Sequence, residues 1–250
     1  PVAESEQDKV IDRARALGIA LFETADSHAA GDMERRLGER LKADDAARIV
    51  TKIGTDLDAP VPRKRFDAKY LEAAFDGSRK RLGRDVLDVA LLHNPSEDAI
   101  KAGAAADFMA GLVDAGKLRA WGVSAGSVEV ARAAIAKGAQ VLSLAVNVLA
   151  SSDVAALATD IDQKEVGVLA HSVLAYGLLC GHWSADKVFA DNDHRAERWT
   201  SDELRRRLRQ LDALRPAVGG PVLTLRSAAL RYVLHNRSVS SAVLGPRSSL

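Results

Sequence analysis

Four polar side chains suited to proton transfer follow short apolar runs of this sequence. Glu23 and His28 lie in the segment FETADSH (22–28), Lys52 ends the run VTK (50–52), and His93 ends the run before NP in LLHNP (91–95). When such runs form neighbouring parallel strands, their carboxyl ends converge on one rim. We therefore expect a carboxylate, an ammonium and two imidazoles in one shared cavity, a set that suits acid–base chemistry.

Lys52 is the member of this set that most needs a partner, because an unpaired ammonium is costly to bury. Glu23 lies one expected strand away and is the obvious carboxylate for it. His93 ends a buried run on the same rim, which favours a site role over that of an ordinary core histidine. A simpler interpretation remains open, in which Glu23 and Lys52 form only a buried ion pair.

His28 decides which reaction this set supports. A free imidazole has a pKa of about 6.5, and a neighbouring Lys52 ammonium lowers that pKa. We expect His28 to be mostly neutral at neutral pH, and so better suited to accept a proton than to deliver one to an alkoxide. The alternative is that His28 is a surface loop residue without a role.

Composition limits the class of protein and its partners. With 47% hydrophobic and 28% charged residues in 250, the chain has the composition of a soluble globular protein. The net charge of +1 gives no electrostatic case for a nucleic-acid partner, and no stretch resembles a membrane span or a signal peptide. The single Cys180 excludes an internal disulfide and fits a reducing, cytoplasmic compartment. No metal-ligand spacing is apparent, and the expected partner is a small-molecule substrate.

Apolar strands and amphipathic helices alternate along the chain. We expect strands at 18–22, 48–52, 86–93, 118–124, 141–146, 166–172 and 240–244. We expect helices at 4–17, 33–41, 67–82, 104–115, 128–136, 153–163 and 221–234, with Gly83 ending the third and Pro221 in the first turn of the last. A long polar insertion at 180–217 interrupts the alternation; its residues 191–195 are expected to form a loop, and leucines at 204, 208, 211 and 214 a helix with a solvated arginine face.

Strict alternation of strands and helices predicts an α/β fold with a parallel sheet, either open and doubly wound or closed into a barrel. No Gly-x-Gly-x-x-Gly pattern follows the first strand, which weakens the open dinucleotide-binding sheet. A barrel of this type has eight strands, whereas the pattern yields seven. We expect residues 1–250 to form a single barrel domain.

Several spaced motifs resemble the aldo-keto reductase superfamily. They are FETADSH (22–28), GDMERRLG (31–38), RLG (81–83) before LLHNP (91–95), WGVS (121–124) and HSVLAYGLL (171–179). The resemblance rests on the order and spacing of these motifs together, and it covers nearly the whole chain. In the first motif, Glu23 stands in the family's aspartate place and His28 in its tyrosine place. The resemblance implies a (β/α)8 TIM barrel whose first strand and last helix are missing from this sequence.

The resemblance also implies carbonyl reduction with NADPH. In the family, a tyrosine donates the proton, a lysine paired with an aspartate lowers the pKa of that tyrosine, and a histidine orients the substrate oxygen. By position, these roles fall on His28, on Lys52 with Glu23, and on His93. This chain therefore looks like an atypical member with an altered general acid.

The resemblance implies a set of cofactor-binding residues, some of which depart from the family's pattern. They are Ser124, Ser143, His171, Ser172, Leu174, Gly245 and Arg247. Ser143 stands where the family has glutamine, and His171 where a tyrosine stacks on the nicotinamide ring; an imidazole still stacks, with less area. Arg247 presents a planar fork that suits a 2′-phosphate of NADP.

Three functions follow from these observations. The first is an NADP(H)-dependent oxidoreductase of the aldo-keto reductase type that acts on a small carbonyl or alcohol. The second is a redox-neutral acid–base enzyme, such as an epimerase, isomerase or lyase, with His28 as base. The third is a non-catalytic ligand-binding barrel, since a fold alone does not imply a function.

Overall fold

The computed structural model describes residues 2–42, 44–190, 193 and 195–249. Its main sheet has seven strands in the order β1–β2–β5–β6–β7–β8–β9. Their bounds are Leu21–Glu23, Arg48–Ile53, Leu87–His93, Leu118–Ser124, Val141–Ala145, Gly167–His171 and Ser241–Ala242. Strand order thus follows chain order throughout, as in a barrel, whereas a doubly wound sheet reverses direction at a switch point. The predicted seven strands and the barrel-type order are confirmed.

Most of the expected helices are also present. The helices of the first 144 residues are α1 (Glu4–Ala16), α2 (Asp32–Leu41), α3 (Ala68–Leu82), α4 (Glu97–Lys101), α5 (Ala104–Asp114) and α6 (Val128–Ala136). The Asp67 side chain accepts a hydrogen bond from the Tyr70 N–H at the start of α3, and Gly83 ends this helix in the left-handed conformation. Sequence and structure therefore agree closely on the longest of these helices.

Two expected helices differ from the pattern. The segment 153–163 forms two short helices, α7 (Ser152–Ala156) and α8 (Ala158–Gln163), instead of one. The prediction that Pro221 lies in the first turn of a helix is wrong, because α10 (Leu225–Leu234) begins only after Thr224. A reciprocal capping box between Thr224 and Ser227 sets that start, and Gly219 and Val222 pair in a β-bridge just before it.

A short hairpin that the sequence pattern did not reveal follows β2. Its strands β3 (Thr55–Asp56) and β4 (Arg63–Lys64) pair antiparallel, with Thr55 opposite Lys64. Gly54 makes the turn from β2 into this hairpin with a φ of +112°, and a Cβ at that position would lie 2.3 Å from the ring of Phe66. The turn therefore requires glycine for both its conformation and its close contact.

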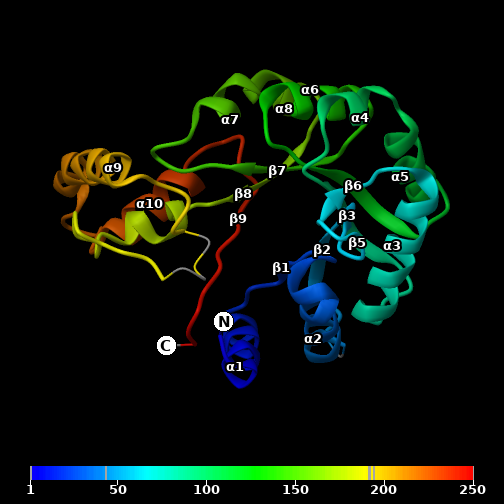
Figure 1. Ribbon diagram of the computed structural model, residues 1–250, viewed down its shortest axis with the longest axis horizontal. Helices are drawn as coiled ribbons and strands as arrows, with labels where there is room; N and C mark the ends of the chain where they lie inside the picture. Colours follow the sequence, from blue (N-terminus) through cyan, green and yellow to red (C-terminus); the bar gives the residue numbers. More distant parts are fainter. Residues whose placement is uncertain (1, 43, 191–192, 194, 250) are drawn as a thin grey trace. The chain divides into compact units, whose positions relative to one another are not determined.

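The chain divides into two compact units. The first comprises residues 1–144, 153–169 and 245–250, and the second comprises residues 145–152 and 170–244. In the first unit, α3 packs against both α2 and α5 beside the strands (Figure 1). Gly38 allows the close approach of α2 to α3, because a Cβ there would lie 2.7 Å from the backbone oxygens of Arg81 and Leu82. The expectation of a single domain over 1–250 stays a prediction.

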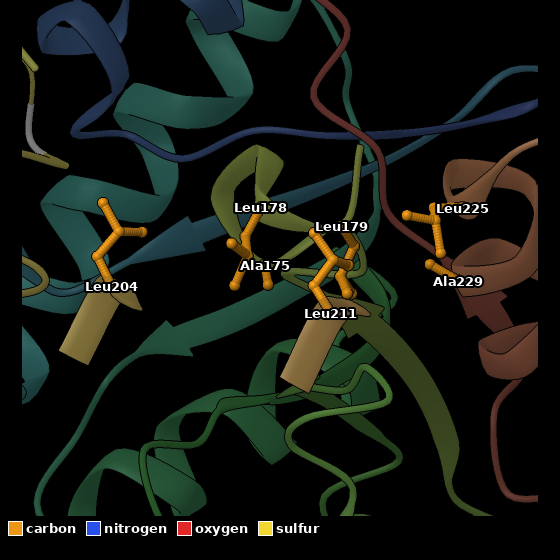
Figure 2. Close-up of a cluster of buried hydrophobic side chains, with 7 residues drawn as sticks. All are labelled: Ala175, Leu178, Leu179, Leu204, Leu211, Leu225 and Ala229. Atoms are coloured by element: carbon orange, nitrogen blue, oxygen red, sulfur yellow. The ribbon is translucent and has the colours of Figure 1, made fainter. Parts of the chain in front are cut away.

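The second unit has its own apolar core, built around the 3-10 helix η2 (Ala175–Cys180), α9 (Ser201–Leu214) and α10. Its buried side chains, shown in Figure 2, are Ala175, Leu178, Leu179, Leu204, Leu211, Leu225 and Ala229. The predicted insertion thus contains the expected leucine-lined helix, α9, followed by the 3-10 turn η3 (Arg215–Ala217). Residues 191, 192 and 194, which belong to its expected loop, lie outside the described residues.

Within the residues that the structure describes, no helix combines the length and the apolar character needed to cross a membrane.

Candidate active site

Glu23 and Lys52 form the ion pair that the sequence predicts. Glu23 ends β1 and Lys52 lies near the end of β2, its parallel neighbour in the sheet. Lys52 Nζ donates a hydrogen bond to Glu23 Oε1. Only 7% of the Lys52 side chain and 12% of the Glu23 side chain are exposed, so this is a buried pair. The second carboxylate oxygen of Glu23, Oε2, is buried and has no hydrogen-bond partner among the described residues.

His93 lies at the end of β5, the next strand along, and its ring nitrogen faces two hydroxyl groups. His93 Nδ1 is 3.3 Å from Thr55 Oγ1 and 3.5 Å from Ser27 Oγ. Ser27 follows β1, whereas Thr55 belongs to the β3–β4 hairpin. Two separate chain segments therefore bring hydroxyls to one edge of the imidazole, which leaves Nε2 as the nitrogen that these hydroxyls do not contact.

His28 begins the 3-10 turn η1 (His28–Gly31), which connects β1 to α2. Ala29 and Ala30 of this turn have φ values of +49° and +51°, and Gly31 follows at +89°. Left-handed conformations are unfavourable for alanine, and such strain is characteristic of functional sites. His28 is exposed as a whole residue, but the surrounding protein still partly desolvates its imidazole ring.

Both imidazoles are biased toward their neutral forms. Burial, followed by the positive charge of Lys52, lowers the pKa of His28 below its ordinary value near 6.5. Burial, and the positive charges that Lys64, Lys52 and His28 carry when protonated, lower the pKa of His93 to about 3. The Lys52 ammonium thus contributes to both of these pKa shifts. The sequence-based expectation of a neutral His28 agrees with the direction of this shift.

Asp26 is an acidic group in this region that sequence reasoning did not single out. Burial and the nearby Glu34 carboxylate raise the pKa of Asp26 to about 6, against the effect of hydrogen bonds from the Gly54 and Ser27 backbone. Its Oδ1 is buried without a hydrogen-bond partner in the described part of the chain. The pKa of Asp26 is therefore close enough to neutral pH for this group to gain and lose a proton there.

Tyr70 does not take the place of the tyrosine missing at position 28. It is the one tyrosine in residues 1–144, and burial together with the Asp26 and Asp56 carboxylates raises its pKa to about 12. A proton donor of this family type requires the opposite shift, toward neutral pH. Tyr70 is therefore not the proton donor of this site.

The motifs GDMERRLG and RLG have a structural role, because their side chains link helices α2 and α3 to strand β2. Glu34 of α2 is fully buried, and its carboxylate accepts hydrogen bonds from Thr51 Oγ1 at 2.5 Å and from Arg81 Nε at 2.6 Å. This network joins the GDMERRLG motif, the strand that carries Lys52, and the RLG motif. Their presence in the sequence therefore reflects how α2 and α3 hold β2 in place.

Ser124 and Ser143, two of the implied cofactor residues, are partners in the register of β6 and β7. Ser124 Oγ donates a hydrogen bond to Asn94 Oδ1 at 3.0 Å, and the Asn94 N–H bonds to the Ser124 carbonyl. Ser143 Oγ is buried and has no hydrogen-bond partner among the described residues. Neighbouring hydroxyl and amide groups of this kind suit a ligand carboxamide, which both donates and accepts hydrogen bonds.

The other implied cofactor residues are divided between the two units of the chain. His171, Ser172 and Leu174 belong to the second unit, where His171 Nδ1 lies 3.0 Å from Ser172 Oγ and Leu174 packs against the apolar core. Gly245 and Arg247 belong to the first unit and are exposed. Their role toward a cofactor stays a prediction.

The sequence analysis missed Asp26, Ser27, Thr55, Lys64 and Asn94 as site residues. Asp26, Ser27 and Asn94 lie within the motifs FETADSH and LLHNP, so the motifs themselves carried that signal. Thr55 and Lys64 reach the site through the two-residue strands of a hairpin, which are too short to produce a periodic pattern.

Comparisons with a family model and with known sequences agree on one protein family. The family model described as "Aldo/keto reductase family" matches residues 1–250. An uncharacterized oxidoreductase of Mycobacterium tuberculosis is 34% identical over 186 residues, which are 71% of this chain and 53% of that protein. An aldo-keto reductase of Strobilurus tenacellus is 31% identical over 208 residues, 77% of this chain and 57% of that protein. The chain thus spans about half the length of the curated relatives that it matches.

Solved structures show the same fold. A glycerol dehydrogenase from Gluconobacter oxydans superposes with a TM-score of 0.87 at 22% identity, over 98% of this chain and 77% of that one. The holo form of an aldo-keto reductase from Bacillus halodurans gives 0.84 at 20% identity, over 100% and 80%. The fold is therefore the (β/α)8 barrel type, in agreement with the strand order. With a family model matched over its whole length, this chain belongs to the aldo-keto reductase family.

Proposed function

We propose that the protein is an NADP(H)-dependent oxidoreductase that reduces a small carbonyl compound, or oxidises the matching alcohol, without a tyrosine as general acid. The observation that carries this proposal is the buried Glu23–Lys52 pair beside the neutral imidazoles of His28 and His93. Membership of an oxidoreductase family supports the reaction class. The substrate and the cofactor preference are part of the proposal.

The chemistry of the proposed site follows from the protonation states. A neutral imidazole donates one hydrogen bond and polarises a carbonyl without carrying charge. We assign this role to His28 and to Nε2 of His93, whose Nδ1 faces the hydroxyls of Ser27 and Thr55. Negative charge that develops on the carbonyl oxygen is stabilised by the Lys52 ammonium, which Glu23 holds in position. The alcohol is completed when this oxygen takes up one proton from solvent water.

The residues on the nicotinamide side fit a bound dinucleotide. Ser143 Oγ is a buried hydroxyl without a partner among the described residues, and it lies beside Ser124 on the neighbouring strand. Together with Asn94, these residues would hold the carboxamide group of the nicotinamide. When bound, NADPH supplies the hydride. Arg247, which belongs to the same unit as these serines, remains the proposed contact to its 2′-phosphate.

The redox-neutral alternative depends on a base that works near neutral pH. His93 is a poor candidate, because its pKa is about 3, and His28 is shifted in the same direction. Asp26, with a pKa of about 6, has the more suitable base strength. Product formation without any consumption of NADPH would favour this alternative over carbonyl reduction.

Two measurements on the full-length protein test the proposed function. The first is NADPH binding, followed by the change in nucleotide fluorescence or by calorimetry. The second is NADPH oxidation with a panel of small aldehydes and ketones. We expect binding and carbonyl-dependent oxidation in the wild type, and a loss of turnover with retained binding in Lys52→Met. The proposal is wrong if NADPH does not bind at millimolar concentration.

A further inference from the structure

The β3–β4 hairpin brings an additional ammonium to His93. Thr55 and Lys64 are register partners in this antiparallel pair, so their side chains lie on the same face. Lys64 Nζ donates a hydrogen bond to Thr55 Oγ1 at 2.7 Å. Thr55 Oγ1 in turn lies 3.3 Å from His93 Nδ1. The three groups therefore form a continuous chain from the hairpin to the imidazole.

The direction of the hydrogen bonds follows from the chemistry of these groups. An ammonium has no acceptor, so Thr55 Oγ1 accepts from Lys64 and keeps its own proton to donate. A cation bound to a hydroxyl oxygen polarises the O–H group and makes it a stronger donor. His93 Nδ1 is the acceptor that the structure provides for this proton. Nδ1 then accepts, and the ring proton lies on Nε2.

We propose that Lys64 is a positioning residue that acts through Thr55 to hold His93 in the tautomer with its proton on Nε2. The inference rests on the proposed function, in which the Nε2–H group faces the carbonyl oxygen. Ser27 is compatible with the same tautomer, because its Oγ lies 3.5 Å from the same Nδ1 and a hydroxyl can donate as well as accept. Gly54 contributes indirectly, since its turn fixes where the hairpin begins.

Lys64 serves the imidazole because its hairpin neighbours engage the nearby carboxylates. Arg63 pairs with Asp56, and Arg65 pairs with both Asp56 and Asp67. In the part of the chain that the structure describes, no carboxylate forms an ion pair with Lys64, whose hydrogen bond goes to a neutral hydroxyl. Lys64 is thus a hairpin cation whose hydrogen-bond partner, the Thr55 hydroxyl, is uncharged.

The ionisable groups that disfavour a positive charge on His93 come from three elements. Lys64 lies on β4, Lys52 on β2 and His28 on η1, and with burial they lower the pKa of His93 to about 3. Lys64 has the largest effect of the three. Its ammonium therefore disfavours a second proton on the ring, while the Thr55 hydroxyl directs the first proton to Nε2.

The test follows the ring nitrogens of His93 by NMR in the full-length protein labelled with ¹⁵N-histidine. We expect the Nε2–H tautomer in the wild type. Thr55→Val removes the hydroxyl at similar volume and is expected to populate the Nδ1–H tautomer, whereas Thr55→Ser keeps the wild-type form. Lys64→Met is expected to raise the pKa of His93 by about 1, and Lys64→Arg to leave it near the wild-type value. Lys117→Met, at an exposed lysine before β6, is the matched control.

The proposal is overturned if the wild type holds the Nδ1–H tautomer. It is also overturned if Thr55→Val and Lys64→Met leave both the tautomer and the pKa of His93 unchanged. These readouts require no turnover, so they are separate from the proposed function, which fails instead if no carbonyl compound causes NADPH oxidation. Where turnover is present, we expect Thr55→Val to lower kcat about tenfold with a smaller change in KM.

Discussion

Replacing Lys52 by methionine tests whether Glu23 and Lys52 form a buried ion pair in which each charge compensates the other. The change removes the ammonium and keeps a side chain of similar length. Because only 7% of Lys52 and 12% of Glu23 are exposed, the energetics of a buried pair apply rather than those of a surface pair. Removing one partner of a buried pair costs about 3–5 kcal/mol, since the other charge remains without compensation.

The surroundings of Glu23 explain why we expect Lys52→Met to lower the free energy of unfolding by an amount in that range. Its Oε2 already has no hydrogen-bond partner among the described residues, and Lys52→Met leaves Oε1 without its partner as well. For a chain of 250 residues, a loss of this size lowers the melting temperature by roughly 10 °C. Replacing Glu23 by glutamine in the same protein removes the uncompensated charge. We expect the double variant to recover about 2 kcal/mol.

Urea unfolding followed by circular dichroism measures these differences for the wild type, both single variants and the double variant. Lys117→Met is the control for loss of an exposed lysine, and its free energy of unfolding should remain within about 0.5 kcal/mol of the wild type. The reasoning is refuted if Lys52→Met costs less than about 1 kcal/mol. It is also refuted if the double variant is no more stable than Lys52→Met.

Three further predictions concern individual site residues. His28→Tyr restores a phenol beside Lys52, and we expect it to raise kcat for carbonyl reduction by at least about tenfold; an unchanged or lower kcat in steady-state assays contradicts the assigned position. Asp26→Asn is expected to stabilise the protein by about 2 kcal/mol above pH 7, because a carboxyl group whose pKa is raised to about 6 makes folding less favourable once it ionises. That gain should shrink as the pH falls through about 6 and disappear near about pH 3, where Asp26 is protonated in both states; thermal unfolding across about pH 3–8 measures it, and a gain independent of pH contradicts the assignment. Ser143→Ala is expected to weaken NADPH binding about fivefold in fluorescence titrations, whereas the exposed Ser201→Ala is expected to have no effect.

The sequence predicted the main sheet well because its signals are local. Largely apolar runs such as 118–124 identify buried parallel strands, and Gly83 marks the end of α3. The start of α10 was misplaced because the capping box at Thr224 competes with Pro221, and periodicity alone does not rank such signals. The single helix expected at 153–163 is divided at Leu157, which no glycine or proline marks.

The site was predicted in its charged centre but not in its surroundings. Glu23 and Lys52 could be paired from the sequence, because a buried lysine requires a carboxylate and the strand order supplies one. Thr55 and Lys64 could not, since they depend on a two-residue hairpin whose geometry is set by a turn at Gly54. The raised pKa of Asp26 likewise depends on burial and on a carboxylate from another element, and neither is visible in a local pattern.

The most direct test of the proposed reduction is transfer of deuterium from NADPH labelled at C4 of the nicotinamide to a carbonyl substrate. Mass spectrometry of the alcohol product measures this transfer for the full-length wild type and for Lys52→Met. Our account predicts a singly deuterated alcohol from the wild type, formed at least about 100-fold more slowly by Lys52→Met. Absence of deuterium from every product, or equal rates for the two proteins, would contradict it.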